Sequence, residues 1–143
     1  MPAPTPDQRV LHLLQLAAHR LRKHSDRRGL ETAGVTTAQA GALLVIAGQP
    51  GATQREIAQA LKLRESAVTA MIARLLEARL VERSSSASDK RAWSLHLTDK
   101  GAKALAALRV ELDQLNAKLG EALGDDGMQQ LSAALRTIVS LKL

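Results

Sequence analysis

Trp93 is the only Phe, Trp or Tyr residue among 143 residues, and the sequence contains no cysteine. The absence of cysteine excludes disulfides, thiolate metal sites and thiol-based sensing of oxidants in this chain. With a single aromatic ring, binding of nucleic acid by stacking of successive bases is excluded as well. The chemistry of the chain therefore rests on charge, small polar side chains and aliphatic packing.

Long hydrophobic runs are also missing. The longest, Ala42–Ala47, is far too short to cross a bilayer, and the N-terminal MPAPTPDQRV has no apolar signal core. We therefore expect a cytoplasmic protein without a membrane partner. The sequence has neither a glycine-rich phosphate loop nor a serine, histidine and acid set with the spacing of a catalytic motif. An enzyme, a cofactor and a metal site are not expected.

Positive charge, in contrast, is in excess. Lysine and arginine number 20 against 14 acidic residues, which gives a formal charge of +6. The excess lies in 1–28 and 53–97, whereas acidic and basic residues balance from Thr98 onward. A basic chain of this kind favours a polyanionic partner. Hydrophobic residues make up 45% of the sequence, which is enough to bury the core of a domain.

Two helices are predicted before the centre of the chain. The first covers 7–28, and its apolar stripe consists of Val10, Leu14, Ala17 and Leu21. After a polar stretch over 29–35, either Thr36 or Thr37 caps a second helix over 38–47. The side chains that this second helix is expected to bury are Leu43, Leu44 and Ile46.

The centre of the chain predicts two short helices joined by a tight turn. Thr53 and Glu56 form the capping box of a helix over 54–61, and the next helix covers 65–78. The apolar face of that next helix consists of Val68, Met71, Ile72, Leu75 and Leu76. Its opposite face carries Ser66, Ala67, Thr69, Ala70, Ala73 and Arg74. Small and hydroxyl residues with one arginine suit close approach to base edges and thymine methyl groups; simple exposure to solvent is the alternative reading.

A two-stranded ribbon with a polar, serine-rich tip follows. Its inner face is predicted to consist of Trp93, Leu95 and Leu97, so Trp93 is expected in the core at the base of the ribbon rather than stacked on a ligand. At the tip, Lys90 and Arg91 can contact phosphates or enter a narrow minor groove, and Asp89 can orient Arg91. A solvated run of charges is the alternative. Two helices, a turn and a ribbon together predict a winged helix-turn-helix.

The last part of the chain predicts two further helices, separated by a break over Gly124–Gly127. Leucines at spacings of three and four run through the first of them from Leu105 to Leu119. Together with the first helix, these segments carry more apolar surface than a small winged helix can cover, so we infer a helical dimerisation domain. Its contact residues are predicted to be Val10, Leu14, Ala17, Leu21, Leu112, Leu115, Leu119, Met128, Leu131, Leu135 and Ile138.

The predicted fold is therefore mostly α with a small β-wing: a winged helix-turn-helix plus a helical dimerisation domain formed by the N- and C-terminal helices. Residues 1–35 are assigned to an N-terminal arm and dimerisation helix, 36–98 to the DNA-binding domain and 99–143 to the C-terminal dimerisation helices. The two-fold symmetry of a dimer predicts a pseudo-palindromic site in double-stranded DNA with half-sites about 10 bp apart.

Two segments resemble the MarR family of bacterial transcription regulators, namely SAVTAMIARLLEARLVER (66–83) and DKRAWSLHLTDKG (89–101). They are similar to the family's recognition helix, its Asp-x-Arg wing and a helix start of the form Leu-Thr-acidic-Lys-Gly. The resemblance implies a homodimer with the recognition helix in the major groove, the wing in the adjacent minor groove and release by a small phenolic or anionic effector. It places the reading residues within Ser66–Arg74 and the wing pair at Asp89 and Arg91.

Two positions depart from the family's pattern. Arg79 stands where glycine often follows the recognition helix, which predicts a non-glycine residue in a left-handed cap at a cost of roughly 1 kcal/mol. Arg64 stands where serine often caps that helix, and it cannot accept the N–H bonds of the helix. Arg64 instead places a cation at the helix end nearest DNA, where it is a candidate phosphate contact.

These features predict a dimeric, sequence-specific DNA-binding regulator, in the simplest case a repressor relieved by a small ligand. If Arg74 reaches a base, it should supply about 1–3 kcal/mol of discrimination. The alternatives are an architectural DNA-coating protein with little sequence preference and a ligand-binding winged-helix module that no longer reads DNA. His12 and His19 share one helical face and are candidates for the lining of a ligand pocket; metal ligation and solvent or interface positions are the other readings.

Overall fold

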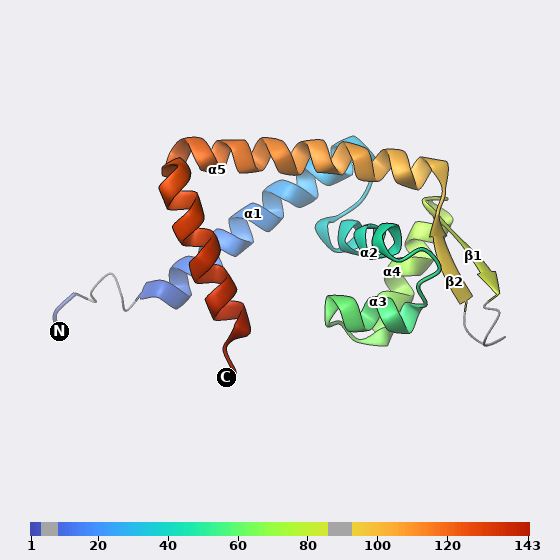
Figure 1. Cartoon of the computed structure of the whole chain (residues 1–143), viewed down its shortest axis with the longest axis horizontal. Helices are drawn as coiled ribbons and strands as arrows, with labels where there is room; N and C mark the ends of the chain where they lie inside the picture. Colours follow the sequence, from blue (N-terminus) through green and yellow to red (C-terminus); the bar gives the residue numbers. More distant parts are fainter. Residues whose placement is uncertain (4–8, 86–92) are drawn as a thin grey trace. The chain divides into compact units, whose positions relative to one another are not determined.

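The computed structural model describes residues 1–3, 9–85 and 93–143 (Figure 1). Its elements, in chain order, are α1 (Val10–Ala33), α2 (Thr37–Gly48), α3 (Gln54–Leu61), α4 (Glu65–Glu77), β1 (Val81–Ser85), β2 (Trp93–Leu97) and α5 (Asp99–Ser140). The mostly helical architecture with one two-stranded antiparallel sheet confirms the predicted fold class. The chain divides into two compact units, Met1–Leu108 and Arg109–Leu143.

No single helix within the described residues is long and apolar enough to cross a membrane. The pair formed by α1 and α2, which are bent by 66° relative to each other, meets the same length and composition test only when the two helices are taken together.

The first unit is built around an aliphatic core. Its largest fully buried side chains are Val35, Leu43, Ile46, Ile57, Val68, Ile72, Leu75 and Leu95. Leu105 and Leu108 join this core, so the first leucines of the α5 stripe serve the winged helix itself. Leu44 is 41% exposed, and its predicted burial is wrong. It follows Leu43, which fills the core position, and one residue along a helix turns the side chain by about 100°.

The end of α1 lies further along the chain than predicted. The stretch expected as a polar connection over 29–35 is helical up to Ala33, and Gly34 ends the helix in the left-handed conformation with φ 69°. Gly29 allows the chain after the helix to pack closely, because a Cβ at that position would lie 2.5 Å from the carbonyl oxygen of Val35. The start of α1 is described from Val10, and residues 4–8 lie outside the described part of the chain.

Both helix starts predicted from capping residues are confirmed. Thr36, rather than Thr37, caps α2 and forms a capping box with Gln39. Thr53 and Glu56 form the second box at the start of α3. In each case the threonine hydroxyl accepts a backbone N–H that has no partner within the helix, which fixes where the helix begins.

Asp26 ties α1 to the N-terminus of α2. Its Oδ1 accepts a 2.7 Å hydrogen bond from the backbone N–H of Thr37. Hydrogen bonding by the Thr37 side chain, then by its backbone, lowers the pKa of the Asp26 carboxyl, and the charge of Arg22 lowers it further against the opposing effect of burial. A carboxylate at a helix N-terminus is also favoured by the helix dipole. The sequence does not reveal this cap because it comes from another helix.

The ribbon pairs Val81 with Leu97 at its base and Ser85 with Trp93 at its outer end. Leu95 is buried, whereas Trp93 is 45% exposed, so the predicted place of Trp93 in the core is wrong. The alternation of faces is correct, but the core ends at Leu95. Beyond it the Arg83 guanidinium covers the indole, with Cζ 4.8 Å from the ring centroid.

The first turn of α5 is fastened to the end of α4. The Thr98 hydroxyl donates a 2.6 Å hydrogen bond to the carbonyl oxygen of Arg79 and accepts one of 3.0 Å from the N–H of Gly101, so Thr98 caps α5. Lys100 Nζ donates a 2.9 Å hydrogen bond to the carbonyl oxygen of Ala78. The Thr-acidic-Lys-Gly pattern therefore builds a clamp between the helix that leads into the ribbon and the helix that follows it.

Two backbone positions in this clamp are constrained. A Cβ on Gly101 would lie 1.9 Å from the carbonyl oxygen of Leu80, so only glycine fits there. Arg79 has φ 60°, which confirms the predicted left-handed conformation of a non-glycine residue after the recognition helix.

The second unit consists of the remainder of α5 and the chain end. Gly124, with φ 74° and ψ 169°, interrupts the helix and confirms the predicted break. No residue of 109–143 is fully buried. Its exposed large apolar side chains include Val110, Leu112, Leu123, Leu131, Leu135, Ile138, Val139 and Leu141.

Candidate nucleic-acid interface

Helices α3 and α4 form the helix-turn-helix. The chain turns at Lys62, which has φ 54°, and the N–H of Leu63 donates a 3.0 Å hydrogen bond to the carbonyl oxygen of Ala58. Arg64 is the extended N-cap residue of α4 and makes no side-chain cap bond, as predicted. The Arg64 side chain is exposed at this end of α4.

Helix α4 presents opposite faces to the core and to solvent. Its buried side chains are Val68, Ile72 and Leu75. The predicted reading residues are all exposed, namely Arg64, Ser66, Ala67, Thr69, Ala70 and Arg74. The Thr69 hydroxyl lies 2.9 Å from the Glu65 carbonyl oxygen and 3.0 Å from Gln54 Oε1. Gln54 of α3 is thereby held at the same surface, a position that depends on a contact between two helices.

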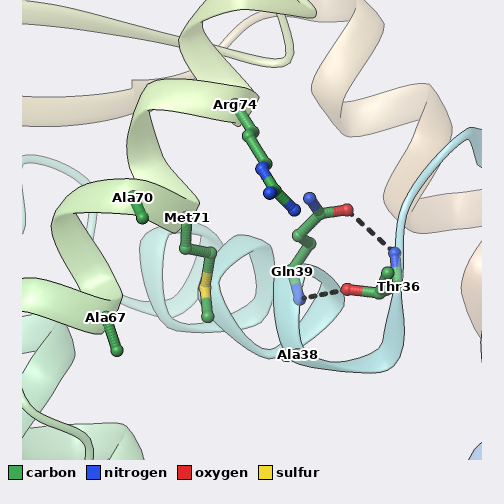
Figure 2. A pocket seen from close by; sticks show the side chains of 7 residues that line it. All are labelled: Thr36, Ala38, Gln39, Ala67, Ala70, Met71 and Arg74. Carbon is green, nitrogen blue, oxygen red and sulfur yellow. Dashed lines mark hydrogen bonds between the residues drawn. The ribbon is translucent and has the colours of Figure 1, made fainter.

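A small hollow opens between α4 and the first turn of α2 (Figure 2). It has a volume of about 220 Å³ and is lined by Thr36, Ala38, Gln39, Ala67, Ala70, Met71 and Arg74. The sequence assigns Ala67, Ala70 and Arg74 to the reading face but gives no sign of Gln39, whose contribution depends on how α2 packs against α4. Figure 2 shows the guanidinium of Arg74 reaching toward the amide of Gln39.

The predicted wing residues Asp89, Lys90 and Arg91 lie outside the described residues. The described stem of the ribbon carries one exposed cation–aromatic pair, Arg83 over Trp93. This pair adds a positive charge on the strand that leads to the tip.

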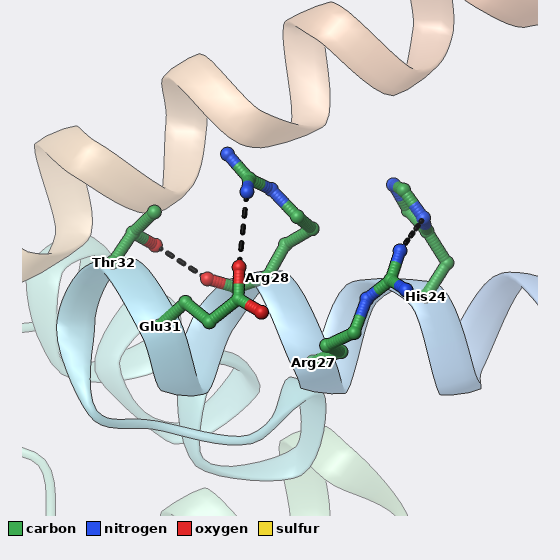
Figure 3. Close-up of polar contacts among 5 residues, drawn as sticks. All are labelled: His24, Arg27, Arg28, Glu31 and Thr32. Atoms are coloured by element: carbon green, nitrogen blue, oxygen red, sulfur yellow. Dashed lines mark hydrogen bonds and ion pairs between the residues drawn. The ribbon is translucent and has the colours of Figure 1, made fainter.

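Helix α1 carries a second hollow of about 580 Å³, lined by His19, Arg20, Lys23, His24 and Arg27. Arg27 Nη2 lies 3.3 Å from His24 Nδ1, and on the next turn Arg28 pairs with Glu31 at 3.0 Å (Figure 3). His19 lines this hollow, whereas His12 does not; the two are seven residues apart, about 10 Å along a helix. Among the described residues, no group of three His, Cys, Asp or Glu side chains could hold a metal ion.

The residues predicted to form the dimer contact remain open to solvent in the single chain. Those that are exposed are Val10, Ala17, Leu21, Leu112, Leu131, Leu135 and Ile138. Those that are half-buried are Leu14, Leu115, Leu119 and Met128. Apolar surface of this extent is unusual for a monomer and typical of an interface.

Comparison with known proteins gives matches in sequence and in structure. Residues 33–92 match the MarR family. A Thauera aromatica protein, named as a candidate transcriptional regulatory protein for the hcr operon, is 38% identical over 77 residues. That match covers 54% of this chain and 46% of the relative, so the chain spans about half the length of that protein.

Two solved structures of DNA complexes are similar over nearly the whole chain. The transcriptional repressor CouR, bound to a 23-mer DNA duplex, is 31% identical with a TM-score of 0.75, covering 96% of this chain and 99% of CouR. The Staphylococcus aureus MepR–DNA complex is 25% identical with a TM-score of 0.80, covering 95% of this chain and 98% of MepR. The family and these relatives are transcription regulators rather than enzymes.

Proposed function

Because the chain belongs to the MarR family of transcription regulators, we propose that it is a homodimeric repressor that binds a pseudo-palindromic site in double-stranded DNA. The observation that carries this proposal is the exposed face of α4, which between Ser66 and Arg74 holds only small, hydroxyl and arginine side chains. Such a face can enter the major groove without steric hindrance. CouR and MepR are each bound to DNA in the structures compared above, which supports the proposal.

In this proposal each group of residues has a distinct task. The residues facing base edges are Ser66, Ala67, Thr69 and Ala70. Arg64 contacts a phosphate, while Lys90 and Arg91 reach the adjacent minor groove with Asp89 orienting Arg91. Residues 36–98 bind DNA, and 1–35 and 99–143 form the dimer.

The apolar stripes support the dimer. Helices in proteins are held mainly by packing of an apolar face, and no residue of the second unit is fully buried in the single chain. A second copy of the chain supplies the missing apolar surface, as in other obligate homodimers. We expect Leu135→Lys to convert the dimer into a monomer in light-scattering measurements, and an unchanged mass would contradict this interface.

The proposed effector is a small phenolic or anionic compound. The described residues that line the hollow on α1 are all basic or histidine, which favours an anion. Of the two histidines predicted to line a ligand pocket, His19 lines this hollow and His12 does not.

The test of the DNA-binding function is binding of the purified protein to duplex from its own upstream region, with random duplex as competitor, over a salt series. We expect preference for the upstream duplex by about 10³ or more and protection of a site with two-fold-related halves. Equal binding to both duplexes would indicate an architectural coating protein. No binding even at low salt would indicate a winged-helix module that does not read DNA.

A further inference from the structure

We propose that the hollow between α2 and α4 binds one phosphate of the DNA backbone in each half-site, and that Arg74 and Gln39 hold it. This inference rests on the proposed DNA-binding function and deepens it. It assigns Arg74 to positioning the protein on the backbone rather than to reading a base. It also gives α2, which carries no predicted reading residue, a direct part in binding.

The orientation of the Gln39 amide is fixed by the cap of α2. Its Oε1 accepts a 2.9 Å hydrogen bond from the N–H of Thr36, and its own backbone N–H donates to Thr36 Oγ1 at 3.3 Å. With the oxygen engaged, the Nε2 group is the end of the side chain left for the hollow. The Gln39 Nε2 group and the Arg74 guanidinium are both donors, so these two groups cannot hydrogen-bond to each other.

None of the described residues that line the hollow offers these two donors a carboxylate. Apart from Thr36, whose hydroxyl already accepts the Gln39 backbone N–H, the described walls are formed by alanines and Met71. Apolar walls reduce the screening of a charge held between them. An oxyanion that bridges Nε2 and the guanidinium would satisfy both groups with charge-assisted hydrogen bonds.

The size and position of the hollow indicate which anion it takes. Its volume of about 220 Å³ is below the roughly 300–1,000 Å³ of pockets for drug-sized ligands, but it admits a phosphate group. Ala67 and Ala70 belong both to its lining and to the exposed face of α4. The hollow therefore lies at the edge of the face proposed to enter the major groove, where the phosphate backbone borders the groove.

The decisive variant is Gln39→Glu. Glutamate at the third position of a helix keeps the capping box, so α2 remains capped, but it replaces the Nε2 donor with a negative charge. We expect an unchanged melting temperature and an affinity lowered about tenfold or more for upstream and random duplex alike. Gln114→Glu makes the same charge change at an exposed position of the second unit and should alter affinity by less than about twofold.

A phosphate contact can be located with upstream duplexes in which single phosphates are replaced by neutral methylphosphonates. One position per half-site should weaken wild-type binding but leave Arg74→Ala and Gln39→Glu unaffected, and Arg74→Ala should reduce the salt slope by about 1. A free-anion site would show no position at which the protein and DNA changes couple, which would overturn the proposal.

Three outcomes separate this inference from the function on which it rests. If Gln39→Glu binds DNA like the wild type, or if Arg74→Ala changes which sequence is preferred, the phosphate assignment is wrong while the regulator remains. If wild-type protein binds upstream and random duplex equally, sequence-specific regulation fails, yet coupling of one methylphosphonate position to Arg74 would still support the phosphate site. If the wild type binds neither duplex, both proposals are wrong.

Discussion

The carboxylate of Asp26 on α1 accepts a 2.7 Å hydrogen bond from the backbone N–H of Thr37 in the first turn of α2. Hydrogen bonding from Thr37 holds the pKa of Asp26 below its usual 3.8 in the folded protein, so the unfolded chain takes up the proton at higher pH than the folded one. The stabilisation is therefore fully present above the unfolded pKa and is lost as the pH falls through the folded pKa.

Asp26→Ala should lower the free energy of unfolding by about 1 kcal/mol at pH 7. The difference from wild type should shrink as the pH is lowered below 3.8, measured by urea unfolding at each pH. Asp26→Asn keeps an acceptor without the charge, so its free energy of unfolding at pH 7 should lie between those of the wild type and Asp26→Ala. A loss that is the same at all pH values would contradict this role of the carboxylate.

Gly101→Ala should destabilise the protein by about 3 kcal/mol, because the added methyl group would overlap the Leu80 carbonyl and force the clamp apart. Chemical unfolding measures the loss. Gly48→Ala is the matched control, since nothing lies within 4 Å of a Cβ there, and it should be neutral or stabilising by up to about 1 kcal/mol. Equal effects at the two positions would show that the contact with Leu80 is unimportant.

Arg79→Gly should stabilise the protein by about 1 kcal/mol, because glycine adopts φ 60° without the penalty of a side chain. The backbone carbonyl that accepts the Thr98 hydroxyl is retained. The same change at Arg109, within helix α5, should destabilise by about 1 kcal/mol. Thermal unfolding of both variants tests the assignment, which fails if Arg79→Gly melts below the wild type.

Arg64→Ser should have opposite effects on stability and binding. Serine can accept the free N–H groups of α4, and the extended backbone at position 64 suits a cap, so the free energy of unfolding should rise by about 1 kcal/mol. If Arg64 contacts a phosphate, DNA affinity should fall and the salt slope should decrease by about 1. Unchanged affinity with a raised melting temperature would leave Arg64 without a role at the interface.

The loss of stability should differ sharply between Trp93→Ala and Leu95→Ala. Leu95 is 1% exposed, and Leu95→Ala should cost about 3 kcal/mol. Trp93→Ala should cost only about 1 kcal/mol, the contribution expected from an exposed cation–π pair with Arg83. Since Trp93 is the only tryptophan, Arg83→Ala should also change the intrinsic fluorescence, and an unchanged spectrum would mean that Arg83 does not cover the indole in solution.

The parts of the fold that follow local rules could be predicted from the sequence. Thr53 with Glu56, the buried spacing of α4 and the break at Gly124 each depend on residues a few positions apart. The predicted burial of Leu44 and Trp93 is wrong because hydrophobic character and alternation indicate which face a side chain lies on. They do not indicate how far the core extends along the helix or strand.

One part of the candidate site could likewise be predicted from local sequence patterns, and another part could not. The exposed face of α4 follows from helical periodicity alone, and its residues are found where expected. The hollow could not be predicted, because it exists only once Gln39 of α2 and Arg74 of α4 meet in the packed structure. The cap supplied by Asp26 is hidden for the same reason, since a partner on another helix leaves no periodic trace in the sequence.

The clamp made by Thr98, Lys100 and Gly101 has a mechanical consequence. Its two carbonyl acceptors, on Arg79 and Ala78, belong to the segment that joins α4 to β1, and the contact of Gly101 with Leu80 leaves no clearance. We therefore expect the first turn of α5, the end of α4 and the root of the ribbon to move as one body. A rotation of this turn would then shift the surface of α4 as well.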